Sequence, residues 1–219
     1  MSVLESIPPV KTKLRARTQA EKAIRKQSIV DALKYLLMHS DELPSAMQIA
    51  QQAGVTKSVI YQYFASREEI FLTLLIQLSV PLLNLTEQTF NDIKDIQKNF
   101  IAYFLENPLF MRLSIMAPVI LEDNVDPAVV KTFKLSAAHV MIEMAKLIEP
   151  FCTASEESRR TFINSFYQLS LMKWRYCHPP KSVQQAFEGE NFWLVSFEIE
   201  SELNLAFEWL WTGLKHSNT

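Results

Sequence analysis

The stretch from Ser45 to Phe64 places the tightest constraint on the fold, because it holds the start and stop signals of two short helices. Ser45 is a predicted N-cap, since its hydroxyl can accept from the free amides of a first helical turn. Gly54 stands where that helix must end, and glycine tolerates the left-handed conformation used there. Thr56 is the predicted N-cap of the second helix. Two helices joined by so short a turn predict a helix-turn-helix, with the second helix as the reader.

The two sides of the predicted reading helix differ in chemistry. Ile60 and Phe64 lie four residues apart and are expected to face inward. Lys57 and Tyr61, also four apart, share another face, whose cation, hydroxyl and amide groups suit phosphate oxygens and base edges. In the preceding helix the apolar residues at helical spacing are Met47, Ile49, Ala50 and Ala53. The predicted small core is made of Ile49, Ala50, Val55, Ile60 and Phe64.

The sequence of this region resembles that of the TetR family of one-component transcriptional regulators, over about residues 22–75. Beyond this region only the layout of helices is similar. The matching segments are Ile49-Ala50, Ala53-Gly54-Val55-Thr56-Lys57, Ile60-Tyr61-Gln62-Tyr63-Phe64 and Ser66-Arg67-Glu68-Glu69-Ile70. The resemblance implies DNA-facing roles for Lys22, Arg25, Ser45, Thr56, Lys57, Ser58, Tyr61, Gln62, Tyr63 and Arg67. Lys57 and Ser58 are expected at base edges and Tyr61 at phosphate. Half-buried packing is the alternative for Tyr63.

The charge distribution is uneven along the chain. Residues 1–70 carry a net charge of +3, whereas the remainder carries −5. A small positive module on a mildly acidic body is typical of a DNA reader with a separate second function. We predict a flexible basic arm over residues 1–17 and a DNA-binding domain over 18–66. The arm lies along DNA or is simply a solvated tail.

Composition predicts an all-α protein, because the 219 residues include only 3 glycines and few stretches look β-rich. The longest apolar runs, such as residues 70–78, are too short to span a bilayer, and the charged N-terminus lacks the apolar core of a signal peptide. We therefore expect no membrane partner and a cytoplasmic location. Cys152 and Cys177 form neither a metal spacing nor a disulfide framework.

Enzyme chemistry has no support in the sequence. There is no Gly-rich phosphate loop, no metal-ligand cluster and no local Ser/His/Asp set. We therefore predict no catalytic residues, no metal and no cofactor.

Residues 67–219 predict a larger helical ligand-binding and dimerisation domain. A capping box at Ser66–Glu69 starts a long helix to about residue 89, which Pro81 is expected to kink or end near Ser79. In the TetR family this helix links the two domains mechanically. Further helices are expected at about 91–106, 109–116, 126–148, 155–176, 181–187 and 191–215, with Pro118 ending the second of these and a loop at 120–124.

The middle helices are rich in methionine and aromatic residues, which together can line an adaptable apolar cavity. Simple core packing is the alternative for each residue. The predicted ligand-binding residues are Phe100, Tyr103, Phe104, Met111, Met116, Phe133, Met141 and Trp174. Few charges interrupt these helices, so the expected effector is a small apolar or weakly polar molecule.

The last helix is apolar over more than one face, which calls for a second burial partner. In the TetR family the last two long helices of each subunit form a four-helix bundle across a two-fold axis, so the resemblance implies a homodimer. The predicted interface residues are Phe166, Leu169, Leu203, Phe207, Leu210 and Trp211. The alternative is a helix buried within one subunit.

These patterns favour a DNA-binding transcriptional regulator, expected to be a repressor released from a palindromic double-stranded operator by its effector. Two alternatives stay open. One is a regulator that binds DNA only with its ligand, and the other is a helical protein–protein adaptor that has lost DNA binding.

Overall fold

The structure, a computed structural model, describes residues 19–190 and 198–216. Within these ranges there are helices and no strands, which confirms the all-α expectation. The predicted arm at residues 1–17 and the predicted start of the last helix at 191–197 lie outside the described residues. In chain order the helices are α1 (Gln19–His39), α2 (Ala46–Gln52), α3 (Lys57–Ile60), α4 (Arg67–Leu83), η1 (Asn84–Glu87), α5 (Ile93–Glu106), α6 (Pro108–Met116), η2 (Ala117–Leu121), α7 (Pro127–Leu147), η3 (Glu149–Phe151), α8 (Glu156–Cys177), α9 (Lys181–Ala186) and α10 (Ile199–His216).

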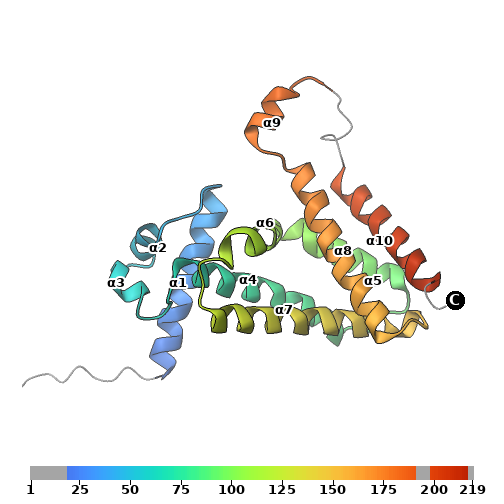
Figure 1. The fold of residues 1–219 in the computed structure, drawn as a ribbon, viewed down its shortest axis with the longest axis horizontal. Helices are drawn as coiled ribbons and strands as arrows, with labels where there is room; N and C mark the ends of the chain where they lie inside the picture. The colour runs from blue at the N-terminus through green and yellow to red at the C-terminus, as the bar shows by residue number, and fades with distance from the viewer. Residues whose placement is uncertain (1–18, 191–197, 217–219) are drawn as a thin grey trace, which may run out of the picture.

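Helices α1 to α3 form one end of the molecule, and α4 and α7 run side by side away from it (Figure 1). At the other end α8 packs against α10, and α5 lies against α10 as well. Helix α9 stands beyond the C-terminal end of α8. Because α4 packs on both α1 and α7, it joins the small end unit, α1–α3, to the larger helical body.

The small unit has a compact apolar core. Ile29 and Leu33 of α1 are buried, as are Ile49 of α2 and the pair Ile60 and Phe64. The predicted core of this unit is therefore confirmed, with Val55 only partly buried. Ile24, which is 71% exposed, and Met47, which is 59% exposed, lie outside this core although both are apolar. Helical spacing alone does not tell which apolar residues lie over the core.

Helix α4 starts with a cap and continues further than expected. The Ser66 hydroxyl accepts from the Glu69 amide at 3.2 Å, while the Glu69 carboxylate accepts from the Ala65 amide at 2.7 Å, one residue before a full capping box. The predicted kink or end near Ser79 was wrong, because the helix runs through Pro81 to Leu83. Pro81 lacks the amide that would bond to the carbonyl of Gln77, and the α-helix ends two residues after it, at Leu83.

One stretch, Arg67–Thr86, has a mean hydropathy of 1.6 and is long and apolar enough, by length and composition alone, to cross a membrane. The expectation that every apolar run is too short was therefore wrong for this helix. Its larger apolar side chains, including Ile70, Phe71 and Leu74, are buried, and it packs against α1, α6 and α7. A helix at the centre of a folded domain has this composition too.

Helix α6 ends at Met116, just before Pro118, as expected, but the chain does not leave helical geometry there. The chain continues into η2, a π-helical turn in which the Glu122 amide donates to the Ala117 carbonyl at 3.0 Å. Pro118 is the second residue of that turn, so the change from α-helix to π-helix falls at this proline. The predicted loop at 120–124 therefore begins only after Leu121.

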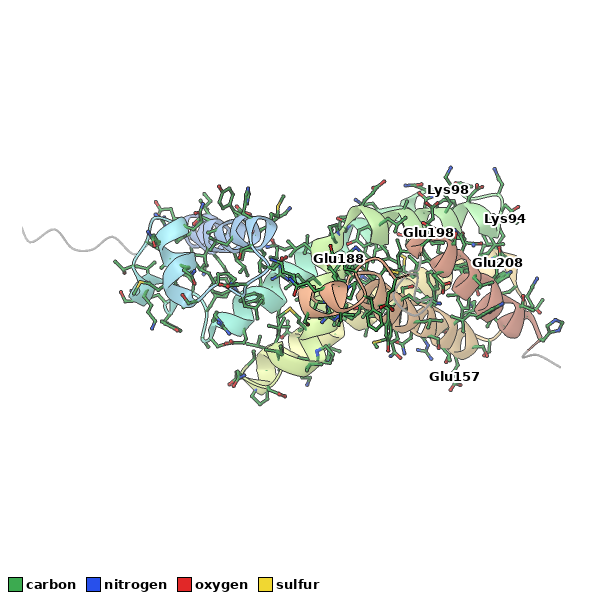
Figure 2. All side chains as sticks on the ribbon, turned by 90° about the horizontal axis from the view of Figure 1, so that it is seen from above. Lys94, Lys98, Glu157, Glu188, Glu198 and Glu208 are labelled. Carbon is green, nitrogen blue, oxygen red and sulfur yellow. The ribbon has the colours of Figure 1, made fainter. Side chains whose placement is uncertain are left out.

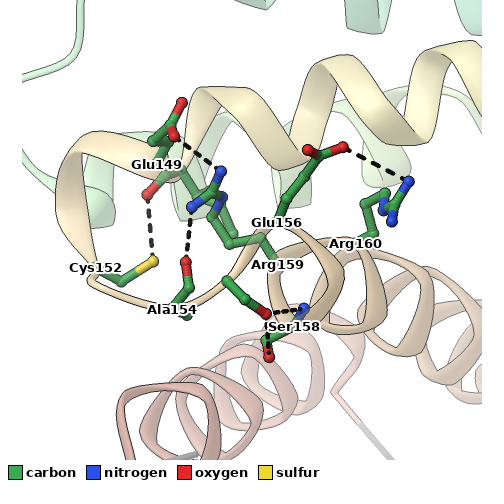
Figure 3. A network of polar contacts seen from close by, with 9 residues as sticks. Glu149, Cys152, Ala154, Glu156, Ser158, Arg159 and Arg160 are labelled. Atoms are coloured by element: carbon green, nitrogen blue, oxygen red, sulfur yellow. Dashed lines mark hydrogen bonds and ion pairs between the residues drawn. The ribbon is translucent and has the colours of Figure 1, made fainter. Parts of the chain in front are cut away.

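The corner between α7 and α8 is held by a polar cluster (Figure 3). The Arg159 guanidinium is buried and donates to the Ala154 carbonyl at 2.7 Å and to the Glu149 carboxylate at 2.9 Å. The Cys152 thiol donates to the Ile148 carbonyl at 3.6 Å. These bonds fix the turn that aligns α8 on α7. At the outside of the body, charges such as Lys94, Lys98 and Glu157 project away from the helices (Figure 2).

Candidate nucleic-acid interface

The turn between α2 and α3 has the geometry that the sequence predicts. Ser45 and Gln48 form a full capping box, in which the Gln48 amide donates to the Ser45 hydroxyl at 3.3 Å and the Ser45 amide to the Gln48 side chain at 2.8 Å. Gly54 has φ +64°, so it takes the left-handed conformation that glycine permits. The Val55 amide then donates to the Ala50 carbonyl at 2.9 Å and closes the turn.

The reading helix is shorter than expected. Regular helix covers Lys57–Ile60, and the chain continues in tighter turns, with the Phe64 amide donating to the Ile60 carbonyl at 3.1 Å. Thr56 occupies the N-cap position, but its hydroxyl hydrogen-bonds to the Ser58 hydroxyl at 2.8 Å instead of capping the helix. The pair of hydroxyls therefore lies together at the start of α3.

Four predicted contact residues form one exposed face, which we call the reading face: Lys57, Ser58, Tyr61 and Gln62. The Lys57 ammonium lies 5.9 Å from the centroid of the Tyr61 ring, so the two residues share one side as their spacing predicted. Tyr61 is 48% exposed. The face thus presents an ammonium, two kinds of hydroxyl and an amide to solvent. These groups bond phosphate oxygens and base edges.

The other predicted contacts differ in their surroundings. Lys22 is exposed and Arg25 is half-buried on the first turns of α1. Tyr63 is half-buried against the core, as in the packing alternative. The Arg67 guanidinium bonds to the Glu68 carboxylate at 2.8 Å and lies 5.8 Å from the Phe71 ring centroid, so a neighbouring acid already offsets its charge.

Two contacts behind the reading face were not among the predicted site residues. The Lys26 ammonium lies 4.8 Å from the centroid of the Phe64 ring, which ties α1 to the end of the reading segment. The side-chain amides of Gln27 and Gln77 donate to each other at 2.8 and 3.2 Å and join α1 to α4. Lys26 is one of several basic residues near the start of α1, which the sequence shows. Nothing in the local sequence indicates that Gln27 pairs with Gln77, 50 residues away.

The body contains a cavity of about 70 Å³, which we call the core cavity. It is bounded by α4, α5, α6, α7 and α8. Of the predicted ligand residues, those that line it are Phe100, Phe104, Phe133 and Met141. Among the described lining residues, Ser79 and Tyr167 carry hydroxyls and none is charged. Burial raises the pKa of the Tyr167 hydroxyl, which keeps it neutral at physiological pH.

The structure does not bring the other four predicted ligand residues into this cavity. Met111 is fully buried in the core. Tyr103 is buried too, donates its hydroxyl to the Leu78 carbonyl, and has its pKa raised by burial and by Tyr167. Met116 and Trp174 line a separate groove near α9. Methionine and aromatic content predicted an apolar interior but did not distinguish cavity walls from solid core.

The predicted dimer residues need correction. Four of them, Phe166, Leu203, Phe207 and Trp211, are buried inside the protomer and belong to its own core. Phe207 packs edge-on against Phe166, with ring centroids 5.1 Å apart. Leu169 stays at the surface, and Leu210 is partly buried. The exposed apolar residues on the same two helices, which the prediction missed, are Met172, Tyr176, Leu205 and Trp209.

A helix-turn-helix with an exposed polar reading face, joined through one helix to a larger helical domain, defines a DNA-binding regulator rather than an enzyme. Residues 45–74 match the family model of bacterial regulatory proteins, tetR family. Residues 84–218 match the model described as Tetracyclin repressor-like, C-terminal domain. That second match covers more than half of the chain, so this chain belongs to the TetR family of DNA-binding transcriptional regulators. The family likeness also extends beyond residue 75, where only the helix layout was expected to agree.

Curated relatives include the nucleoid occlusion factor SlmA from two strains of Haemophilus influenzae. Each is 30% identical over 123 residues, which cover 51% of this chain and 54% of the relative. The chain thus spans about half the length of these relatives.

Two solved structures share the fold. Thermus thermophilus FadR, a TetR family transcriptional repressor in complex with lauroyl-CoA, is 17% identical with a TM-score of 0.59, covering 86% of this chain and 94% of that one. A TetR-family regulator from Mesorhizobium loti is 12% identical with a TM-score of 0.52, covering 90% and 98%.

Proposed function

We propose that this chain is a homodimeric transcriptional repressor that leaves a palindromic operator when an apolar small molecule binds its helical body. The reading face carries this proposal, because its four polar side chains are exposed on a helix that is held by a buried core. In our proposal Lys57 and Ser58 read base edges and Tyr61 bonds phosphate. Lys22 and Arg25 add phosphate contacts from α1. In this proposal the protein acts in the cytoplasm, where its DNA partner lies.

The core cavity supports an apolar effector. Its described walls carry no charge, so burying a charged group there would be costly. The structural neighbour FadR was solved with lauroyl-CoA, a molecule with a long acyl chain. A cavity of about 70 Å³ is about half the size of one that accommodates benzene, so an acyl chain has to widen it.

Widening the core cavity gives a route to the DNA-binding unit. Helix α4 contributes Leu75, Ile76, Ser79 and Leu82 to the cavity wall. The same helix packs on α1 and is joined to it through the amides of Gln27 and Gln77. An effector that displaces α4 therefore changes the separation of the two reading helices in a dimer. Because the effector binds this altered conformation more tightly than the conformation that fits the operator, it lowers the affinity for DNA.

Exposed apolar residues on α8 and α10 support the dimer. Leu169 and Met172 of α8, and Leu205 and Trp209 of α10, are exposed although both helices already bury one apolar side in the protomer. A second copy covering these residues explains the excess.

The first experiment is binding of the purified protein to DNA upstream of its own gene at two salt concentrations. We expect tight, salt-sensitive binding of a dimer, because phosphate contacts release counterions. Lys57→Ala and Tyr61→Ala should each weaken it about tenfold or more. Lys34→Ala and Tyr35→Ala, at exposed positions in the C-terminal half of α1, are matched controls and should change the DNA affinity less than about twofold.

Other results separate the alternatives. Binding that appears only when a cell extract is added indicates a regulator that requires its ligand. An absence of selective binding on several fragments, with and without extract, contradicts DNA reading and leaves the adaptor.

A second experiment tests the effector. Fatty acyl compounds of increasing chain length are expected to raise the unfolding temperature and to release DNA, because each added methylene buries apolar surface. Met141→Trp, which fills the core cavity, should abolish both effects, whereas Leu135→Trp at an exposed position of α7 should keep them. Stabilisation only by small polar anions would contradict an apolar effector.

The relatives offer a second candidate role, nucleoid occlusion, supported by the 30% identity over about half of each chain. Mapping the bound sites on the chromosome distinguishes the two roles. A repressor occupies a few sites beside promoters, whereas blocking division over the nucleoid requires sites spread along the chromosome.

A further inference from the structure

A groove of about 1070 Å³ lies between the small N-terminal unit and the body, and no described residue lines both it and the core cavity. Its walls are the C-terminal end of α1, helix α6, and the segment that runs from the end of α8 into α9 (Figure 1). We call it the joint groove. Its apolar lining includes Met38, Leu109, Ile115, Met116 and Trp174.

One wall of the joint groove is a fixed aromatic shelf. The Trp174 and His178 rings stack with centroids 4.2 Å apart and an interplanar angle of 20°. His178 is held in place because its Nδ1 atom hydrogen-bonds to the Trp174 carbonyl at 2.8 Å. Arg175 in turn donates to the His178 carbonyl at 3.1 Å, and Pro179-Pro180 restricts the backbone that follows. The shelf therefore exists before any ligand arrives.

The joint groove is positively charged, although the body that forms most of it is acidic. Among its described lining residues Arg112, Arg175 and Lys181 are cationic, and Asp41 is the one acid. Residues 71–219 together carry a net charge of −5, so this gathering of cations runs against the local composition. Arg175 and Lys181 are exposed and can turn toward an anion without losing a buried bond.

Arg112 connects the joint groove to the DNA-binding unit. Its guanidinium donates to the carbonyls of Leu37 at 3.3 Å, Ser40 at 3.0 Å, and Asp41. A guanidinium has five N–H donors, so two remain without a partner among the described residues. A ligand anion can accept from these donors while Arg112 still bonds the end of α1.

We infer that the joint groove binds a small anionic amphiphile, with its acidic group paired to Arg175 and Lys181 and its apolar part on the Trp174 shelf. The acidic group is a carboxylate, sulfonate or phosphate, since each accepts several charge-assisted hydrogen bonds. This site goes beyond the proposed repressor function, because no described residue that lines the core cavity carries a charge to pair with an acidic group. The occupant touches α1, α6 and α9 together, so it bridges the body and the DNA-binding unit.

The test uses two fluorescent probes with nearly the same aromatic body. One is 8-anilinonaphthalene-1-sulfonate, which carries a negative charge, and the other is N-phenyl-1-naphthylamine, which is neutral. We expect saturable binding of the sulfonate by the full chain, weakened by added salt, and binding of the neutral probe at least about tenfold weaker. Equal affinity for the two probes, or an affinity for the sulfonate independent of salt, would overturn the assignment.

Matched variants locate the probe. The double variant Arg175→Ala/Lys181→Ala should weaken sulfonate binding about tenfold, and Trp174→Ala should weaken it by a similar factor. Lys94→Ala/Lys98→Ala removes the same charge from exposed positions of α5 and should change it less than about twofold (Figure 2). Tyr35→Ala is the matched aromatic control, because Tyr35 is exposed and also stacks on a histidine four residues later, His39.

The core cavity is tested by Met141→Trp, which should leave sulfonate binding unchanged. Loss of binding in Met141→Trp but not in Arg175→Ala/Lys181→Ala would move the probe to the core cavity and refute the joint-groove site. An equal loss in both charge variants would show general attraction to positive charge and refute it as well. No DNA enters the assay, so its result is independent of the repressor proposal. Circular dichroism checks that every variant is folded.

Discussion

The small unit of α1–α3 and the larger helical body differ in where their proposed functional residues lie: at the surface in the small unit and in the interior in the body. In the small unit the four residues of the reading face are polar and exposed, and a few buried residues such as Ile49, Ile60 and Phe64 hold them in position. In the body the cavity walls are apolar and buried, so the residues that would meet an effector are also residues of the core. This difference explains why the small unit is easier to interpret from sequence than the body.

The largest expected effect is a loss of stability in the small unit. Phe64 is 1% exposed, and Phe64→Ala should lower the free energy of unfolding by about 3–5 kcal/mol, because it leaves a cavity that the short helices cannot refill. Urea denaturation measures this. Met47→Ala removes an exposed side chain of the same unit and should stay within about 0.5 kcal/mol. A small loss for Phe64→Ala would show that the unit adds little to the cooperative core.

The next effect concerns the outer surface of the body. Trp209→Ala should weaken dimerisation by about 2 kcal/mol or more, because an exposed aromatic at the centre of an interface typically contributes that much. Sedimentation equilibrium gives the dissociation constant. Leu135→Ala, at an exposed position of α7, is the control and should leave it unchanged. A dimer that is insensitive to Trp209 would refute the proposed α8–α10 interface.

The link between the two regions should respond more weakly. Arg112→Ala removes three bonds to carbonyls at the end of α1, and we expect a loss of about 1–2 kcal/mol, because those carbonyls regain water. Hydrogen exchange at the last turn of α1 should accelerate, while exchange in α8 and α10 stays slow. Equal acceleration everywhere would mean that the two regions unfold only together.

The smallest effect tests the turn of the DNA-binding motif. Gly54 has φ +64° and open space around an added methyl group, so Gly54→Ala should cost about 1–2 kcal/mol through backbone strain alone. Gly213→Ala adds the same methyl group to a helical residue with open space and should stabilise the protomer by about 0.5–1 kcal/mol. Differential scanning calorimetry measures both. The same sign for both variants would contradict the strain argument.

The sequence predicted the small unit well because its signals are local. Ser45, Gly54 and Thr56 mark helix ends through their own side chains or backbone, and four-residue spacing brings Lys57 and Tyr61 together. The body was predicted less well, because an apolar residue is equally suited to a core, a cavity or an interface. Trp211 and Trp209 lie two positions apart, yet one is buried and the other 65% exposed. Only the packing of α8 against α10 decides between them.

The contacts that join distant segments were the least predictable. Arg112 reaches carbonyls more than 70 positions away, and the joint groove that it lines is assembled from α1, α6, α8 and α9. No periodicity or spacing rule brings such residues together. Proline positions were also incomplete guides, since α4 continues two residues beyond Pro81 and the chain stays helical, as a π-helical turn, at Pro118.

The core cavity also has a volumetric consequence. Empty space inside a folded protein makes the packed state less dense than its alternatives, so hydrostatic pressure acts against it. Met141 and Met144 line this void, and their methyl resonances should shift at pressures that leave the residues around Ile49 undisturbed. A ligand that fills the void removes the compressible space, so the pressure response of these two methionines reports occupancy without any label.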